Sequence, residues 1–366
     1  MWVLVLNAGS SSLKTSLIEE PGDRTLASHE LERAPGPDAW IDALRAVLTD
    51  AGEVDAVGHR VVHGGTRHTA PLLLDDAVVD ELGALSGLAP LHNGPALEAI
   101  AAARRAMPGV PQVACFDTAF HAGLPPPAHV YPLPYAWYAD WGIRRFGFHG
   151  LSVTWSVEQA AALLGRPVGE LGLVVAHLGG GCSVTAVMGG RSADTSMGMT
   201  PLEGLMMGTR SGSVDPGILL ELLDDGRLSV SDLSDALQHR SGLLGVSGVS
   251  ADLREVQAAA VAGNVRGALA LELFVRRAAA AIAAAATALP RMDALVFTGG
   301  IGEHAAETRV EVCLRLGQLG VAARLSAPDD EEDAVLSPPG SAVSVLRVAA
   351  REDVVIAREV ARVAVR

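Results

Sequence analysis

The sequence is poor in aromatic residues and in positive charge. Aromatic side chains make up 4% of the 366 residues, and 28 Lys and Arg face 42 Asp and Glu, for a formal net charge of −14. A chain this acidic does not attract nucleic acid in general, so any anionic ligand needs a local cationic pocket. The hydrophobic fraction of 49% excludes disorder, and the length predicts two domains.

Cysteines and long apolar runs are also scarce. Cys115, Cys182 and Cys313 are far apart and form neither a C-x-x-C pair nor an even framework. They predict reduced thiols, mostly in cores, of a cytoplasmic protein. Met1–Leu6 lacks the basic start of a signal peptide, and Ala278–Leu289 falls well short of the ~20 apolar residues that span a bilayer. We therefore expect no membrane partner.

Lysine is almost absent, since Lys14 is the only lysine among the 28 basic residues. A compact ammonium fits a tight loop that a wide guanidinium does not, so this position predicts a specific role. The alternative is chance survival under a coding pressure that replaces lysine by arginine.

Two hairpins of small residues lie about half a chain apart. The apolar run Val3–Leu6 leads through Asn7–Ser12 to Leu13–Ile18, and Gly172–Leu178 leads through Gly179–Gly181 to Cys182–Met188. Each predicts strand, turn and strand, and their recurrence predicts a duplicated α/β architecture with two related domains facing each other across a cleft. The remaining patterns predict helices over 38–48, 95–106 and 353–365, and one or two long helices over 256–289. They also predict strands over 54–57, 110–114, 294–297 and 343–348, a proline-rich connection over 124–136, and a solvated acidic loop over 328–333.

Both hairpin turns could hold phosphate. Backbone N–H groups around Ser10, Ser11 and Ser12 can form an anion nest beside Lys14, and Gly179–Gly181 lets the main chain approach a ligand closely. Taken singly, either could be an ordinary turn, and the Walker A spacing is missing. Gly300-x-Gly302-x-x-Ala305 is compatible with a nucleotide but not with NAD, because no strand-end acid follows about 20 residues later.

Four charged or polar residues stand in apolar, glycine-flanked surroundings. They are Arg60, Asp117, His149 and Arg210. An arginine in such a place needs an anionic partner, although a lone arginine is usually a surface or ion-paired residue. A lone histidine or aspartate is more often a satisfied core group than a site residue. No His, Cys and Asp cluster has zinc-ligand spacing, and no nucleophile elbow occurs.

Eleven stretches together resemble the acetate kinase family, within the acetate and sugar kinase, chaperone and actin superfamily. In chain order they are LNAGSSSLK, GHRVVHGG, APLHN, FDTAFH, RRFGFHG, HLGGG, DTSMGMTPLEG, MGTRSGSVDPG, SADLRE, FTGGIGE and REDVVIARE. The resemblance implies an actin- and hexokinase-like (ribonuclease H-like) fold with an N-terminal lobe of residues 1–121 plus 354–366. Residues 122–353 would form a C-terminal lobe for nucleotide binding and dimerisation.

The resemblance also implies reversible transfer of a phosphoryl group from ATP to acetate, with Mg²⁺ or Mn²⁺, in a homodimer. The implied phosphate and metal residues are Asn7, Ser10, Ser12, Lys14 and Glu352. The implied catalytic residues are Arg60, His92, Asp117, His149 and Arg210, and the acyl pocket comprises Val62, Leu91, Phe148 and Pro201, with Arg60 binding the carboxylate. The implied nucleotide residues are His177, Gly179, Gly180, Gly181, Asp252, Leu253, Arg254, Gly300, Ile301, Gly302 and Glu303.

The chain departs from the family pattern at Gly180, Val153, Ser213 and His304, which stand where asparagine, histidine, aspartate and asparagine are usual. These departures leave two alternatives open. One is a kinase for propionate or butyrate, and the other is an actin-like module that binds ATP without transferring phosphate.

Overall fold

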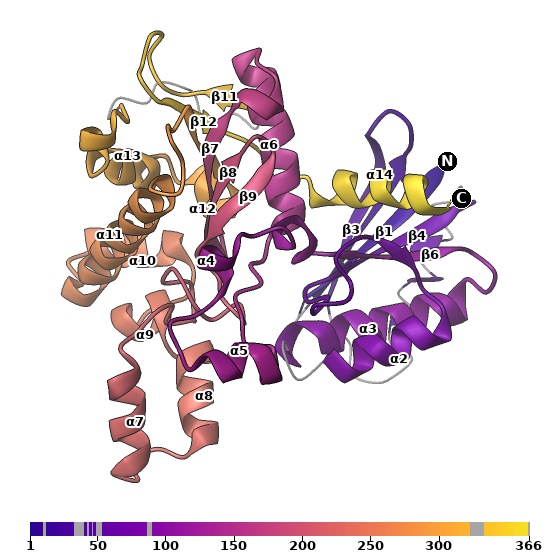
Figure 1. Cartoon of the computed structure of the whole chain (residues 1–366), viewed down its shortest axis with the longest axis horizontal. Helices are drawn as coiled ribbons and strands as arrows, with labels where there is room; N and C mark the ends of the chain where they lie inside the picture. Colours follow the sequence, from indigo (N-terminus) through magenta and orange to yellow (C-terminus); the bar gives the residue numbers. More distant parts are fainter. Residues whose placement is uncertain are drawn as a thin grey trace. The chain divides into compact units, whose positions relative to one another are not determined.

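The computed structural model describes residues 1–9, 12–32, 40–41, 44–45, 47–48, 53–85, 90–322 and 333–364, with residues 32 and 90–92 described in their backbone only. The chain divides into two compact units (Figure 1). Unit 1 comprises Met1–Ala122, Phe148–Trp155 and Arg351–Arg366, and unit 2 comprises Gly123–Gly147 and Ser156–Ala350. Each unit is built around one six-stranded sheet.

The sheet of unit 1 has the strand order β3-β2-β1-β4-β6-β5. Its first three strands are antiparallel, β1, β4 and β6 run parallel, and the short β5 pairs antiparallel with β6. The strands are β1 (Trp2–Ala8), β2 (Ser12–Glu19), β3 (Arg24–Glu32), β4 (Ala56–Val61), β5 (Leu72–Leu73) and β6 (Gln112–Phe116).

The sheet of unit 2 repeats this plan as β9-β8-β7-β10-β12-β11. A three-stranded antiparallel meander again leads into parallel pairs, and a two-residue edge strand again ends the sheet. The strands are β7 (Gly172–Leu178), β8 (Cys182–Met188), β9 (Arg191–Thr195), β10 (Ala294–Thr298), β11 (Ala334–Val335) and β12 (Ser344–Arg347). The predicted duplication is therefore confirmed at the level of strand order.

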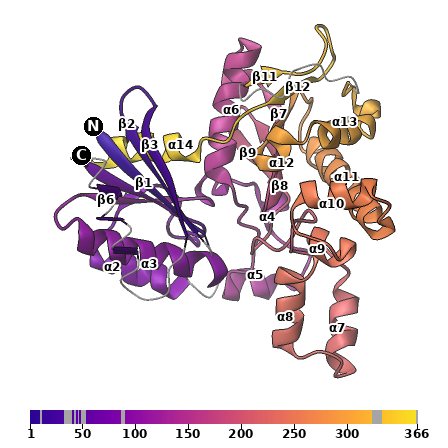
Figure 2. The same cartoon turned by 180° about the vertical axis from the view of Figure 1, so that it is seen from behind.

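Helices cover both faces of the first sheet. Successive side chains of a strand point to opposite faces, and consecutive residues of β1 are apolar, so both faces of the sheet are apolar. Leu4 and Leu6 of β1 pack with α3 (Pro90–Ala106), whereas Val3 and Val5 pack with α14 (Glu352–Ala364). Figures 1 and 2 show α14 on one face and α2 (Asp76–Ala84) with α3 on the other.

Helix α11 packs against β7 and β8. Most helices in the described part of the chain belong to unit 2. They are α4 (Pro126–His129), α5 (Tyr135–Trp141), α6 (Gly150–Leu164, which begins in unit 1), α7 (Pro216–Asp224), α8 (Val230–His239), α9 (Gly242–Ser247), α10 (Leu253–Val261), α11 (Val265–Ala286), α12 (Gly299–His304) and α13 (Ala306–Leu314). Within the described part of the chain, no helix combines the length and apolar character that crossing a bilayer requires.

Most predicted elements are confirmed, with shifts at their ends. The strand predicted over 54–57 begins later, at Ala56, and continues to Val61, because β4 is set by its pairing with β1 and β6. The connection predicted over 124–136 contains α4 and the start of α5, since Pro126 stands in the first turn, where a missing N–H costs nothing. Residues 256–289 form two helices, α10 and α11, and the turn after β10 is the helix α12. Of the acidic loop over 328–333, only residue 333 is described, and the helix over 38–48 is described in part.

Candidate active site

Three parallel strands of unit 1 end at one edge of the sheet and bring three predicted residues together. Asn7 lies near the end of β1, Arg60 near the end of β4, and Asp117 directly after β6. The register places Leu6 beside His59 and Arg60 beside Cys115, so consecutive strands present these side chains at neighbouring positions. The carboxyl ends of parallel strands are the usual place for a ligand site in α/β folds.

Arg60 is the centre of this cluster. Its Nε donates to Oδ1 of Asp117 at 2.9 Å and its Nη2 to Oδ2 at 2.6 Å, which is a bidentate ion pair. Its Nη1 donates to Oδ1 of Asn7 at 3.2 Å and lies 3.3 Å from Oε2 of Glu352. The Asp117 side chain is 1% exposed, whereas that of Arg60 is 18% exposed and so remains accessible.

Helix α14 supplies Glu352 at its first position. Gly58 makes the close approach of this helix to β4 possible, because a Cβ there would lie 2.5 Å from Cγ2 of Ile356. Burial raises the pKa of Glu352, and the Asp117 carboxylate raises it further, although Arg60 lowers it. Burial alone would lower the pKa of Arg60, but the carboxylates of Asp117 and Glu352 hold it above its usual value.

His149 is held near Asp117 by the backbone. It has a left-handed conformation, with φ of 58°, and the next residue, Gly150, donates its N–H to the carbonyl of Asp117 at 2.9 Å. A Cβ at Gly150 would lie 2.2 Å from that carbonyl oxygen, so the contact requires glycine. The buried His121, which the sequence did not single out by itself, contacts the Phe148 carbonyl through Nε2 at 3.0 Å.

The first hairpin turn adjoins this cluster. Gly9 donates its N–H to the carbonyl of Ser12, and Lys14 stands opposite Asn7 across the β1–β2 pair, so the two side chains lie on one face. Lys14 is exposed, with its Nζ 3.8 Å from Glu30, and Ser12 Oγ donates to Glu30 at 3.0 Å. Ser10 lies outside the described residues, and so do the side chains of Leu91 and His92.

Unit 2 places two glycine turns side by side. His177 of β7 pairs with Thr298 of β10, so Gly179–Gly181 and α12 leave adjacent parallel strands at the same edge. A Cβ on Gly179 would lie 3.6 Å from the N atom of Gly300. Gly180 and Gly300 are exposed, and a Cβ on either would meet nothing within 4 Å. The two turns therefore present open backbone to the same region of unit 2.

Arg210 lies on a loop of unit 2 between β9 and α7. Its Nη1 donates to the carbonyl of Pro201 at 3.0 Å and lies 3.6 Å from Sδ of Met207. Burial lowers the pKa of this guanidinium. The loop is held by backbone hydrogen bonds to the α8–α9 junction, including the donation from Ser241 N–H to the Thr209 carbonyl.

The remaining predicted nucleotide residues serve local structure as well. Asp252 caps α10 by accepting from the N–H of Arg254, and the two side chains form an exposed ion pair at 2.6 Å. Leu253 is buried, and Glu303 accepts from the N–H of Ala350 at 3.1 Å. Of the predicted acyl residues, Val62 and Phe148 lie in unit 1 and Pro201 in unit 2.

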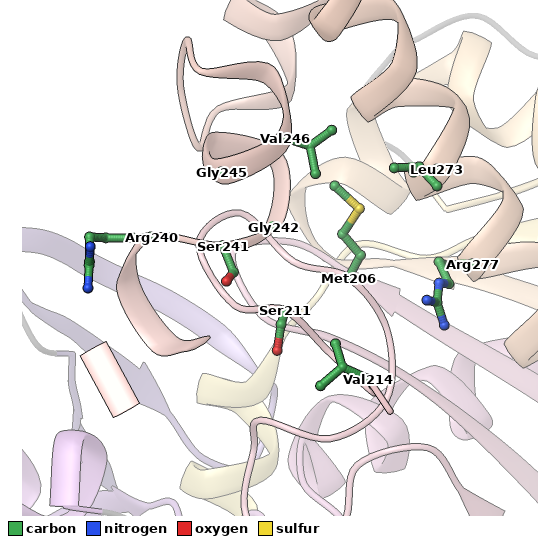
Figure 3. Close-up of a pocket in the computed structure, with 10 residues that line it drawn as sticks. All are labelled: Met206, Ser211, Val214, Arg240, Ser241, Gly242, Gly245, Val246, Leu273 and Arg277. Carbon is green, nitrogen blue, oxygen red and sulfur yellow. The ribbon is translucent and has the colours of Figure 1, made fainter. Parts of the chain in front are cut away.

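A cavity of about 330 Å³ behind the Arg210 loop was not predicted from the sequence. Figure 3 shows Met206 at its centre, with Arg277 of α11 on one side and Arg240 on the other. Ser211 and Ser241 add hydroxyl groups. No sequence signal marked this cavity, because its lining comes from three segments without a shared motif.

The described oxygen donors of the cluster in unit 1 fit a divalent cation. Two carboxylates, Asp117 and Glu352, face one guanidinium, which leaves excess negative charge. Among the described residues, no group of three or more His, Cys, Asp and Glu is placed to hold a metal. Magnesium keeps several waters and takes one or two protein oxygens plus substrate phosphates, so the oxygens of Asn7 and Glu352 suit it.

Known proteins match the chain over nearly its whole length. The acetokinase family model matches residues 32–358. The chain is 44% identical over 396 residues to the acetate kinase of Synechococcus sp. (strain JA-2-3B'a(2-13)), with 98% of each chain covered. Crystal structures of a Porphyromonas gingivalis acetate kinase and a Francisella tularensis subsp. tularensis SCHU S4 propionate kinase each match with 36% identity and a TM-score of 0.89, over 99% and 98% of each chain. The predicted duplicated fold of the actin and hexokinase type is thereby confirmed.

Proposed function

The chain belongs to the acetokinase family, which makes it a kinase, and from this premise we propose that it transfers the γ-phosphoryl group of ATP reversibly to acetate. The products are acetyl phosphate and ADP. The observation that carries the proposal is the Arg60 cluster, in which one guanidinium contacts Asp117, Asn7 and Glu352 at the carboxyl edge of a parallel sheet.

The acceptor needs no general base. A carboxylate is already ionised at neutral pH, so its oxygen is an anionic nucleophile. The difficulty is to bring one anion against another, and catalysis therefore depends on positioning and on neutralising charge. Asp117 suits an orienting role better than a base, because both of its oxygens already accept hydrogen bonds from Arg60.

Arg60 and Arg210 are proposed to bind the substrate carboxylate and the transferring phosphoryl group. Arg60 is fixed on its Asp117 side, and its Nη1 is directed toward Asn7 and Glu352. His149 and His92 are proposed to donate to phosphoryl oxygens. That the cationic groups of both units act on one phosphoryl group stays a prediction.

The nucleotide is proposed to bind unit 2. The open backbone at Gly180 and Gly300 can approach phosphates closely, and His177 and Glu303 lie on the segments that carry these glycines. Asp252, at the start of α10, is proposed to contact the nucleotide with Leu253 and Arg254. Ser12 and Lys14 of unit 1 are proposed to contact phosphate as well. Asn7 and Glu352 would hold Mg²⁺, or Mn²⁺ in its place, and the ion when bound would neutralise charge on the phosphates.

The acyl acceptor is tested by comparing kcat/KM for acetate, propionate and butyrate, with hydroxylamine trapping the acyl phosphate. We expect acetate to be preferred, because Val62, Phe148 and Pro201, together with Leu91, are proposed to close a small apolar pocket. A kcat/KM that rises with acyl length would instead assign the chain to longer carboxylates, as the name of the Francisella neighbour suggests for that protein.

The chain is further proposed to work as a homodimer in the cytoplasm. Helix α7 has no buried residue, and its Ile218 and Leu220 are 52% and 68% exposed, which suits coverage by a second copy. The buried free thiols Cys115, Cys182 and Cys313 suit a reducing compartment. Size-exclusion chromatography with light scattering measures the mass of the protein in solution. A mass equal to that of one chain would contradict the proposed homodimer.

A further inference from the structure

A polar network in unit 2 joins three residues to which the proposed mechanism assigns no role. The Tyr131 hydroxyl donates to Oε2 of Glu203, and Nη2 of Arg145 forms an ion pair with Oε1 at 3.0 Å. The guanidinium also lies over the Tyr131 ring, 5.4 Å from its centroid. Burial raises the pKa of Tyr131, so the phenol stays a donor. We call these residues the Tyr131–Glu203–Arg145 network.

This network fastens the loop over 196–204. Nη1 of Arg145 donates to the carbonyls of Ser196 and Met197, each at 3.0 Å. The Tyr131 hydroxyl accepts from the N–H of Met199 at 2.9 Å. The backbone of the loop lies against the Glu203 carboxylate, because a Cβ on Gly198 would lie 1.8 Å from Oε2 of Glu203. Both ends of the segment that contains Pro201 are thus fixed, at Met199 and at Glu203.

Pro201 connects the network to Arg210. Its carbonyl accepts the hydrogen bond from Nη1 of Arg210 at 3.0 Å. The backbone of Arg210 is held independently, because Met207 N–H donates to its carbonyl and Ser211 N–H donates to the carbonyl of Leu237. The backbone therefore holds the main chain of Arg210 in place, and the Pro201 carbonyl is one of the contacts that orient its guanidinium.

We propose that the Tyr131–Glu203–Arg145 network positions Arg210 for phosphoryl transfer by holding the Pro201 carbonyl; the inference rests on the proposed function. All three residues are positioning residues, since they act through Pro201. Releasing the loop lets the guanidinium turn away, and a misplacement of about 1 Å costs up to roughly 100-fold in rate.

The test uses Tyr131→Phe, which removes one hydroxyl and leaves the ring under Arg145. We expect kcat/KM for acetate to fall about tenfold, while KM for ATP changes less than twofold. Tyr135→Phe is the matched control, because this α5 tyrosine is 67% exposed, and its kinetics should equal the wild type. In an Arg210→Ala background, Tyr131→Phe should cause no further loss, whereas an additive tenfold loss overturns the proposal.

A second measurement separates this inference from the proposed function. Hydrogen–deuterium exchange over residues 197–204 needs no substrate, and we expect Tyr131→Phe and Glu203→Gln to speed it, with Tyr135→Phe unchanged. Unchanged exchange in the first two variants overturns the positioning role even if acetate is phosphorylated. A wild type that makes no acyl phosphate overturns the proposed function and leaves the exchange result to decide the network.

Discussion

Each of the three guanidinium nitrogens of Arg60 has an oxygen partner in one cluster. Arg60→Lys keeps the charge and loses the planar fork, so we expect kcat/KM for acetate to fall roughly 100-fold with little loss of stability. Arg67→Lys is the control, because Arg67 is 78% exposed and should tolerate the change. Equal kinetics in the two variants would contradict the role of Arg60.

Removing the side chain altogether has a second effect. Arg60→Ala leaves the buried Asp117 carboxylate without its partner, which destabilises a protein by about 3–5 kcal/mol. We therefore expect this variant to have a lower urea midpoint as well as a lower rate. A midpoint equal to that of the wild type would show that Asp117 finds another partner.

Two buried histidines make stability depend on pH. Burial lowers the pKa of His59 and of His121 to about 4, although Gln112 and the Phe148 carbonyl partly oppose this. Between pH 6.5 and 4 the unfolded state binds more protons, so the free energy of unfolding should fall as pH falls, by up to about 3 kcal/mol for each histidine. Above pH 6.5 this contribution is complete.

His59→Gln isolates the effect, because the difference between variant and wild type cancels the other titrating groups. We expect urea unfolding of His59→Gln to lose less stability between pH 6.5 and 4 than the wild type does. Stability curves that run parallel for the two proteins would show that burial does not lower the pKa of His59.

At the scale of elements, the packing of α14 on β4 determines where Glu352 lies. Gly58→Ala would place a methyl group 2.5 Å from Ile356 and 2.8 Å from Val360, so α14 must shift. We expect a loss of about 1–3 kcal/mol, measured by thermal unfolding. Gly83→Ala in α2 is the matched control, since a Cβ there meets nothing within 4 Å and alanine favours the helix. Equal melting temperatures for the Gly58→Ala and Gly83→Ala variants would contradict the packing argument.

The sequence predicted elements where apolar runs and glycine turns are strong. β1, β2, β7 and β8 match their predicted runs closely. The ends of β4 and β6 differ because parallel pairing, rather than local composition, determines them. The Tyr131–Glu203–Arg145 network could not be predicted, since Tyr131 and Arg145 precede Glu203 by 72 and 58 residues and only the folded backbone brings the three together.

For the molecule as a whole, the repeated strand order gives the two small-residue turns, between β1 and β2 and between β7 and β8, equivalent places in the two sheets. In each sheet the turn follows the first strand of the meander and stands beside the end of a parallel neighbour, β4 in one and β10 in the other. Asn7 and His177 take equivalent places on β1 and β7. From the residues alone, the sequence predicted this duplication, but the grouping of Arg60 with Glu352 came only from the resemblance and is now seen in the structure.

The contacts of individual residues were harder to predict from the sequence than the duplicated fold. The distance of 345 residues between Asn7 and Glu352 hides their contact from any local pattern. Gly180 and Val153 motivated the alternative of a nucleotide-binding module without transfer. Val153 is fully buried in α6, where its N–H donates to the carbonyl of His149 at 2.9 Å, and Gly180 is exposed.

The stoichiometry of the reaction with ATP, Mg²⁺ and acetate tests the central claim most directly, and ³¹P NMR of the wild-type protein measures it. We predict that ADP and acetyl phosphate appear in equal amounts and only when acetate is present. Release of inorganic phosphate that does not depend on acetate, or bound ATP that stays intact, would contradict transfer to a carboxylate and favour a nucleotide-binding module.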